Sequence, residues 1–386
     1  MKRRIAVITG SRAEYGLLYW TLKELIIIEE IEVFLFVTGM HMSKKFGETY
    51  KEIEADGIAI YKKIDIGILN DSPLGISMSM GVCTSKFGEA FDELKPDILL
   101  VLGDRYEILS AVLAAIPFRI PIAHISGGEI TEGAIDDQIR NCISKLAHLH
   151  FPGATEYAEN LIKMGEEAWR VFNVGDPGIE NIRRLEYIKK SIIFENIGLD
   201  ESKKTLLVTL HPTTLNDIEI EKKESKVFFS TLAKFGELNI VITYPNADGN
   251  NEVIINEIEM LRGKNNIRVV KNLGRINYLS LMKYCDLVLG NSSSGIVEAP
   301  YMQVPTIDYG DRQKGRLMAK SVIHCEPNQV ELKQAIERAL YDGDFTKTVK
   351  ENKGLYGDGD TAQKIVEVLK SVELGNKLLR KKQYSR

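Results

Sequence analysis

Four acidic residues and an arginine follow two apolar, strand-like segments in the first half of the chain. Asp104 and Arg105 come directly after ILLVLG, and Glu129, Asp136 and Asp137 follow RIPIAHI. If the two segments pair as neighbouring parallel strands, both loops open at the same edge of the sheet. A packed core does not need carboxylates at the ends of buried strands, whereas proton transfer or a divalent metal does.

Proton transfer is favoured over metal binding for these acids. Histidines 41, 124, 148 and 150 belong to the same half, but no H-x-x-x-H or H-E-x-x-H pattern appears. His148 and His150 would share one face of a strand, which is typical of buried structural histidines. The four cysteines lie far apart without a C-x-x-C pair, so they predict reduced thiols and neither a disulfide framework nor a zinc site.

A second group of polar residues suits a diphosphate. The stretch DLVLGNSSSGIVEAP has the form strand, small-residue loop, helix, in which Ser292, Ser293 and Gly295 let an anion approach free backbone N–H groups. Glu298, about one turn further on, is placed to accept hydrogen bonds from a ribose diol, or is a favourable first-turn acid. The loop matches neither the Walker A nor the G-x-G-x-x-G pattern, and a structural N-capped helix is the alternative.

Cations and polar residues at other strand ends fit the same ligand. Arg312 lies in the basic loop DYGDRQKGR, which suits a diphosphate clamp, with a solvated basic turn as the alternative. His211 in VTLHP and Asn246 in TYPNADG end two strand-like segments. Arg12, directly after the first strand, suits phosphate or uracil contacts, with a surface ion pair as the alternative.

Short β-branched segments alternate with helix-length amphipathic segments, which predicts βαβ units and parallel sheets covered on both faces. The strand-like segments of the first half are RIAVITG, EVFLFVTG, DILLVLGD, RIPIAHI, HLHFPG and RVFNVG. After Asp176 the rhythm breaks, and it restarts with TLLVTLHP, NIVITYPN, NIRVVKN, DLVLGNSSSG and VPTIDYG. The sequence therefore predicts an α/β protein of two doubly wound, Rossmann-like domains facing a cleft, with residues 1–180 in the first and 181–365 in the second.

Composition and charge exclude several classes of protein. The chain of 386 residues has a net charge of −4 and lacks the basic face of a nucleic-acid-binding domain. No segment reaches the roughly 18 apolar residues of a membrane helix. The start, MKRRIAVITGSRAE, is a poor secretory signal, so we expect a cytoplasmic protein without nucleic-acid or membrane partners.

Seven motifs in order, GSRAEYG, VTGMH, LGDRYE, HISGGEITEGAIDD, TLHP, GNSSSG and GDRQKGR, resemble those of the hydrolysing UDP-N-acetylglucosamine 2-epimerases of sialic and legionaminic acid synthesis. The likeness spans nearly the whole chain, and the joint order is highly specific. It implies the GT-B-like fold of nucleotide-sugar glycosyltransferases, with a C-terminal helix, residues 366–386, crossing back onto the first domain. It also implies no cofactor or metal, and a homodimer or homotetramer.

The reaction that the resemblance implies converts UDP-N-acetylglucosamine and water into N-acetylmannosamine and UDP. The C2 proton is removed and UDP leaves C1, giving a 2-acetamidoglucal; water then adds at C1 while C2 is reprotonated on the other face. Carried over by position, the UDP contacts are Arg12, Arg105, His211, Asn246, Ser292, Ser293, Glu298 and Arg312. Asp104, Glu129, Asp136 and Asp137 fall in the acidic catalytic region, with Asp104 and Asp136 assigned to proton transfer and His211 to the departing UDP.

One residue departs from the pattern of some relatives, which have HIEGG where this chain has HISGG. Ser126 cannot replace a carboxylic acid, so either Glu129 takes that task or the carboxylates divide it differently. An alternative substrate is UDP-N,N'-diacetylbacillosamine on the legionaminic route, which demands a more apolar pocket. The run DSPLGISMSMGVC either lines that pocket or is an ordinary helix packing face. Further alternatives are a non-hydrolysing 2-epimerase, a glycosyltransferase and a non-catalytic UDP-sugar sensor.

Overall fold

The structure is a computed structural model that describes residues 2–44, 47–67, 72–132, 135–213, 215–245, 250–352 and 354–382. It contains two compact units. The first comprises Met1–Glu129, Asp136–Asn181 and Tyr356–Arg386, and the second comprises Ile130–Ile135 and Ile182–Leu355. The sequence-based boundaries differ in two places: the return to the first unit comes ten residues earlier, at Tyr356 rather than residue 366, and a short segment after Glu129 belongs to the second unit.

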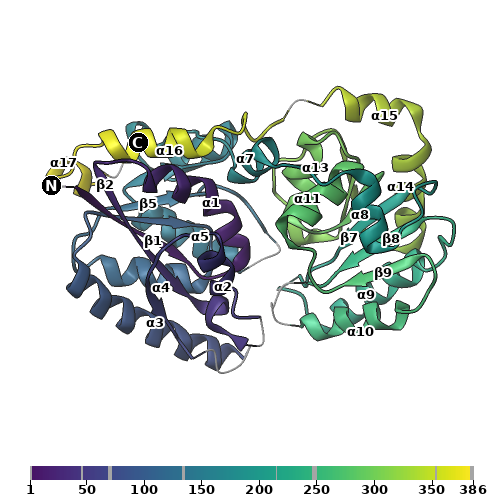
Figure 1. Ribbon diagram of the computed structural model, residues 1–386, viewed down its shortest axis with the longest axis horizontal. Helices are drawn as coiled ribbons and strands as arrows, with labels where there is room; N and C mark the ends of the chain where they lie inside the picture. Colours follow the sequence, from purple (N-terminus) through teal and green to yellow (C-terminus); the bar gives the residue numbers. More distant parts are fainter. Residues whose placement is uncertain are drawn as a thin grey trace. The chain divides into compact units, whose positions relative to one another are not determined.

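The first unit is built on a six-stranded parallel sheet of order β3-β2-β1-β4-β5-β6 (Figure 1). The strands are β1 (Arg3–Thr9), β2 (Ile31–Thr38), β3 (Ile60–Ile64), β4 (Ile98–Leu102), β5 (Ile122–Ile125) and β6 (Leu149–Phe151). The order reverses between β1 and β4. The carboxyl ends of these two strands therefore form the switch point, where ligands bind in doubly wound sheets.

Helices cover both faces of this sheet, because successive residues of a strand point to opposite sides. On β1, Ile5 and Val7 pack in one cluster with α1 and α16, while Ala6 and Ile8 pack in another with α3, α4 and α5. The helices of the unit are α1 (Arg12–Ile26), η1 (Gly39–Met42), α2 (Tyr50–Ala55), α3 (Pro73–Leu94), α4 (Tyr106–Ala115), α5 (Asp136–Leu146), α6 (Thr155–Lys163), η3 (Ala168–Arg170), α7 (Pro177–Arg184, which runs into the second unit), α16 (Thr361–Ser371) and α17 (Asn376–Leu379).

The C-terminal segment is held to the start of the chain. The guanidinium of Arg3 donates to the carbonyls of Lys370 (3.0 Å) and Val372 (2.8 Å), beyond the middle of α16. The buried Arg170 donates to the carbonyl of Leu378 (2.7 Å) in α17. Figure 1 shows α16, in yellow, beside α1, in purple.

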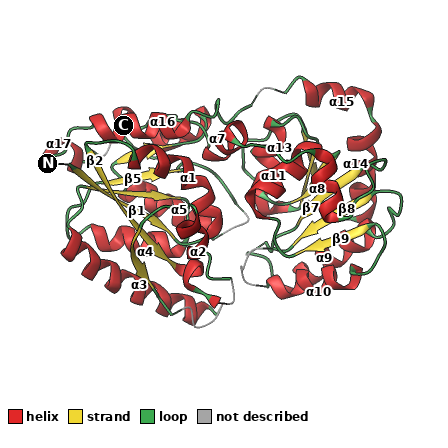
Figure 2. Cartoon of the chain, in the orientation of Figure 1, coloured by secondary structure: helices red, strands yellow, loops and turns green. Residues whose placement is uncertain are grey.

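The second unit repeats the winding of the first with a parallel sheet of order β12-β11-β10-β7-β8-β9, flanked by helices (Figure 2). Its strands are β7 (Thr205–Thr209), β8 (Asn239–Thr243), β9 (Ile267–Val270), β10 (Leu287–Gly290), β11 (Thr306–Tyr309) and β12 (Val322–Cys325). Its helices are α8 (Lys190–Ile197), α9 (Ile218–Leu232), α10 (Asn251–Leu261), α11 (Gly274–Tyr284), α12 (Ser293–Ile296), α13 (Glu298–Tyr301), η4 (Asp311–Gln313), α14 (Gln329–Tyr341) and α15 (Gly343–Lys350). The switch point lies between β7 and β10.

The predicted fold class, two doubly wound α/β domains, is confirmed. One predicted strand is wrong: RVFNVG forms a single β-bridge, between Val171 and His150. The sequence analysis also missed β3 and β12, one edge strand of each sheet, whose residues are less buried than those of the central strands. Among the described residues, none of the helices combines the length and hydropathy that a bilayer span requires.

Candidate active site

The acidic residues after β4 and β5 gather around one buried arginine, Arg140 of α5, whose exposed fraction is 2%. Its Nη2 donates to Asp104 Oδ2, and its Nη1 donates to Asp137 Oδ1 (3.2 Å) and to the backbone carbonyl of Glu129 (3.1 Å). The Asp104 and Asp137 side chains stay 26% and 24% exposed. Three segments predicted to carry chemistry therefore meet at one guanidinium.

The remaining acids lie close to this cluster along the chain. Asp136 is the first residue of α5, directly before Asp137, and is half-buried. Glu129 is 5% exposed and is the last residue before the chain enters the second unit. Ser126 follows β5 with a left-handed backbone (φ 64°), and its N–H donates to the carbonyl of Phe151 (3.0 Å). It brings no carboxyl group to the cluster.

Two buried glutamates lie at the β1–β4 switch point, and the sequence analysis found neither. Glu14 caps α1: its Oε2 accepts the N–H groups of Gly10 (2.6 Å) and Ser11 (3.0 Å), while the Ser11 hydroxyl accepts the Glu14 N–H (3.3 Å). Burial raises the pKa of Glu14 to about 8. Glu107 is 0% exposed in α4, and a Cβ on Gly39 would lie 2.7 Å from its Oε1, so this glycine makes room for the carboxyl group.

The two arginines predicted to contact UDP from this unit already have acidic neighbours. Arg105, the N-cap residue of α4, has its Nε 3.4 Å from Glu107 Oε2. Arg12, the first residue of α1, makes the ion pair that was the alternative to a ligand contact, with its Nε 2.8 Å from Glu52 Oε2. Since both arginines lie at the carboxyl ends of strands that form the switch point, their positions suit anion binding as well.

The histidines of the first unit have structural partners. His41 Nε2 lies 3.0 Å from the Thr9 hydroxyl, and His124 Nε2 lies 2.8 Å from the Gly103 carbonyl. Burial lowers the pKa of each to about 4, so both are neutral at pH 7. His150 Nε2 lies 3.0 Å from the buried Glu166 carboxylate. Their environments are those of core residues.

In the second unit, Asn291 organises the switch point between β7 and β10. Its side chain accepts the N–H of His211 (2.7 Å) and donates to the His211 carbonyl (2.8 Å). Its own carbonyl accepts Arg312 Nη1 (3.0 Å) and Gln313 Nε2 (2.8 Å). Burial, reinforced by the charge of Arg312, lowers the pKa of His211 well below its ordinary value, so this histidine is neutral at pH 7. The sequence analysis predicted His211 and Arg312 but missed the residue that joins them.

The serine loop after β10 forms a short capped helix. The hydroxyl of Ser292 accepts the Ser294 N–H (3.4 Å), Ser293 begins α12, and Glu298 begins α13. A Cβ at Gly295 would lie 2.9 Å from Thr306 Cγ2 of β11, so packing against β11 also favours a glycine there, and its role in ligand approach stays a prediction. Asn246 lies outside the described residues.

The basic loop after β11 contacts Ile130 and Glu132. The Lys314 carbonyl accepts the N–H of Glu132 (3.0 Å). Gly315 has φ 86°, and a Cβ there would lie 2.5 Å from Ile130 Cγ2. The chain between two candidate acids, Glu129 and Asp136, is therefore attached to the loop that carries Arg312.

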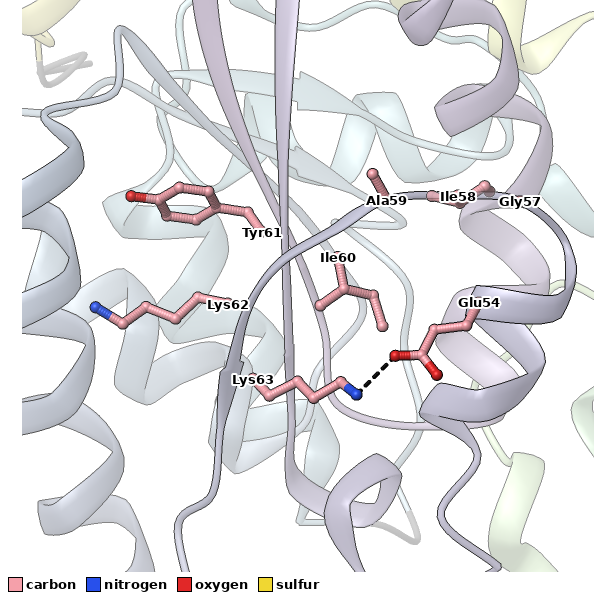
Figure 3. Close-up of a pocket in the computed structure, with 8 residues that line it drawn as sticks. All are labelled: Glu54, Gly57, Ile58, Ala59, Ile60, Tyr61, Lys62 and Lys63. Atoms are coloured by element: carbon pink, nitrogen blue, oxygen red, sulfur yellow. Dashed lines mark hydrogen bonds and ion pairs between the residues drawn. The ribbon is translucent and has the colours of Figure 1, made fainter.

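Two other features of the surface contain no predicted site residue. A hollow of about 690 Å³ lies at the edge strand β3, where Lys63 points to Glu54 at 2.7 Å (Figure 3). Asp311, His324 and Glu326 bring three ligand-type atoms within 4.8 Å of one another, but all three residues are exposed. The predicted absence of a metal site stays a prediction.

Comparisons with known proteins agree with the motifs. The family model described as UDP-N-acetylglucosamine 2-epimerase matches residues 23–370. A GDP/UDP-N,N'-diacetylbacillosamine 2-epimerase (hydrolyzing) of Campylobacter jejuni is 40% identical over 340 residues, 87% of each chain. A UDP-N,N'-diacetylbacillosamine 2-epimerase (hydrolyzing) of Legionella pneumophila is 33% identical over 381 residues, 99% of each chain.

A solved structure gives the same fold. The UDP-GlcNAc 2-epimerase of Neisseria meningitidis, bound to UDP-GlcNAc, superposes with a TM-score of 0.81 at 18% identity, covering 96% of this chain and 100% of that one. The predicted resemblance to hydrolysing 2-epimerases and the predicted enzyme class are confirmed by the relatives and the family match. The chain belongs to the UDP-N-acetylglucosamine 2-epimerase family.

Proposed function

We propose that this protein is a hydrolysing 2-epimerase that converts UDP-N-acetylglucosamine and water into N-acetylmannosamine and UDP, for nonulosonate synthesis. The acidic cluster at the carboxyl ends of β4 and β5 carries the proposal. Asp104 and Asp137 are partly exposed, and the buried Arg140 guanidinium holds both carboxyl groups in place. A protein that only bound UDP-sugars would not need that arrangement. Membership of the 2-epimerase family supports it.

The proposed chemistry begins at C2 of the hexose. A carboxylate, Asp104 or Asp136, takes the C2 proton, and the electrons of the C–H bond form the C1=C2 double bond as the C1–O bond breaks. Both electrons of that bond leave with UDP. Water then forms the new bond to C1 while a second acid delivers a proton to C2 on the opposite face, giving N-acetylmannosamine. The proton that water loses restores the second acid, and the first carboxyl group releases the C2 proton to solvent. Glu129 participates in these transfers or orients the sugar.

The departing diphosphate gains negative charge, which fixed donors must stabilise. We propose Arg312 as the main cation and neutral His211 as a hydrogen-bond donor, since Asn291 holds both segments in place. Glu298 would accept hydrogen bonds from the ribose. The remaining proposed contacts to UDP are Arg12, Arg105, Asn246, Ser292 and Ser293.

UDP-N,N'-diacetylbacillosamine is the second candidate substrate, and a specific observation favours it. The relatives at 40% and 33% identity both carry this sugar in their names. The run proposed to line a more apolar pocket lies in α3, where Cys83 is buried in the core and Met78 is exposed. Core packing therefore accounts for part of that run.

Product identification separates these possibilities. The purified protein should be incubated with each UDP-sugar in heavy water, with UDP release followed by chromatography and the free sugar by mass spectrometry and NMR. We expect free N-acetylmannosamine carrying deuterium at C2. Faster release from the diacetamido sugar would select the second candidate. UDP-N-acetylmannosamine as the end product would show a non-hydrolysing epimerase, and no turnover of either sugar would support the sensor.

We also propose that the protein is a cytoplasmic homo-oligomer, a dimer or tetramer. All four cysteines are free thiols, as suits a reducing compartment. An apolar stripe supports self-association: Leu74, Met78 and Val82, spaced four residues apart on α3, are 70%, 52% and 42% exposed. Light scattering on the wild type and on Met78→Glu tests this: a wild-type monomer would contradict it.

A further inference from the structure

Arg140 is a buried cation below two partly exposed carboxylates. A guanidinium with 2% exposure needs anionic or carbonyl partners, because an uncompensated buried charge is strongly destabilising. Here the partners are Asp104, Asp137 and the Glu129 carbonyl, which come from three separate segments of the candidate active site. The planar guanidinium allows these contacts at once: Nη2 donates to Asp104 in the loop after β4, and Nη1 donates to Asp137 and to the Glu129 carbonyl after β5.

The other fully buried arginine of the unit, Arg170, has a different environment. Its guanidinium donates to the backbone carbonyls of His148 (3.2 Å), Lys377 (3.1 Å) and Leu378 (2.7 Å), and its Nε pairs with Glu167 at 2.8 Å. These partners join the C-terminal segment to the sheet, and none of them is a candidate site residue. Arg170 is thus a natural comparison: equally buried, in the same unit, and structural.

The charges around Arg140 show what it does for the acids. Asp104 and Asp137 contact it through their carboxyl groups, the backbone carbonyl of Glu129 accepts from it, and its charge acts on His124. Asp136 lies one turn before it in α5. His124 on β5 is neutral, since burial lowers its pKa to about 4. A cation in contact with two carboxylates offsets their mutual repulsion, so Asp104 and Asp137 can both contact the same guanidinium.

We propose that Arg140 is a positioning residue of the epimerase reaction, which holds the Asp104 and Asp137 carboxyl groups and the loop after β5 in fixed positions relative to one another. The inference rests on the proposed 2-epimerase activity. One rigid, planar group thereby joins three segments of the chain that carry candidate acids. Arg140 itself supplies no proton.

Steady-state kinetics across pH test the proposal with Arg140→Met, Arg140→Lys and the control Arg170→Met. We expect Arg140→Met to lower kcat about 100-fold through misplacement of the acids. The acid limb of its pH profile should move to higher pH, because Asp104 loses the cation in direct contact with it. UDP affinity should stay within a few-fold, since the proposed diphosphate clamp, Arg312, belongs to the other unit.

The two comparison variants separate positioning from folding. Arg140→Lys should restore the acid limb but recover kcat only in part, because one ammonium cannot replace a fork that holds three partners. Arg170→Met should lower the melting temperature while kcat per folded molecule and the acid limb stay at wild-type values. If Arg140→Met does not fold, kcat of Arg140→Lys decides, and a wild-type kcat in that variant would overturn the proposal. A wild-type protein that releases no UDP would instead refute the proposed function.

Discussion

Replacing Glu14 by glutamine should make the first unit more resistant to alkaline conditions. Glu14 is 6% exposed, its Oε2 accepts two backbone N–H groups, and its Oε1 has no hydrogen-bond partner in the described part of the chain. A glutamine keeps the same acceptor oxygen and the same shape but cannot ionise. Glu14→Gln therefore isolates the cost of a buried negative charge from the capping of α1.

The magnitude follows from the pKa of Glu14, which burial raises from 4.5 to about 8. Below pH 4.5 the group is neutral in both states. Between pH 4.5 and about 8 only the unfolded state ionises, so the wild type loses stability as pH rises, by about 1.4 kcal/mol per pH unit at most. Over the whole interval the wild type loses at most roughly 5 kcal/mol of its free energy of unfolding, and we expect a loss of at least about 2 kcal/mol. The loss is complete above the folded pKa.

Tryptophan fluorescence measures this unit selectively, because both tryptophans of the chain, Trp20 and Trp169, belong to it. Urea unfolding of the wild type and Glu14→Gln from about pH 5 to about pH 9 should give a stability difference that grows with pH and levels off near pH 8. Glu221→Gln is the matched control: Glu221 is 3% exposed in the second unit, burial raises its pKa to about 7, and it should leave the tryptophan-detected pH slope unchanged. A difference between wild type and Glu14→Gln that stays constant across this range would refute the reasoning.

Three further predictions concern the site and the C-terminal segment. Asp104→Asn should lower turnover by about 100- to 10,000-fold while calorimetry finds UDP affinity nearly unchanged; a parallel loss of UDP binding would contradict the division of roles. Asn291→Ala should weaken UDP binding, as measured by calorimetry. It should also lower the free energy of unfolding by about 1–3 kcal/mol for each buried backbone group of His211 that loses its partner, as measured by thermal unfolding. Unchanged UDP affinity would show that Asn291 does not belong to the site. Lys381→Ala should lower the melting temperature and expose the C-terminus to limited proteolysis, because Lys381 pairs with the buried Glu166 carboxylate at 2.6 Å; wild-type protection would show that the pair does not hold the segment.

The central strands could be predicted from the sequence because their burial on both faces produces continuous apolar runs, as in ILLVL of β4. The edge strand β3 was missed since its residues alternate between partly buried and exposed, as in IYKKI. RVFNVG looks like a strand, but it forms only one bridge, and its first residue, Arg170, serves the C-terminal segment instead.

The candidate site divides in the same way. Asp104 and Glu129 could be found because carboxylates at strand ends stand out against apolar runs. Arg140 lies inside α5, where an arginine three residues after an aspartate is typical of an exposed ion pair, and only the fold shows its burial. Asn291 had a weaker signal still: its role depends on hydrogen bonds to His211, 80 residues away. Long-range partners of this kind have no local pattern.

The excursion of residues Ile130–Ile135 into the second unit has a mechanical consequence. The stretch is fastened there by the Glu132–Lys314 hydrogen bond and by the close fit of Ile130 against Gly315, while its two ends continue directly into Glu129 and Asp136. A Cβ at Gly315 would lie 2.5 Å from Ile130 Cγ2, so Gly315→Ala must displace Ile130, the residue that directly follows Glu129. We expect this variant to lower turnover although every proposed acid and base is retained.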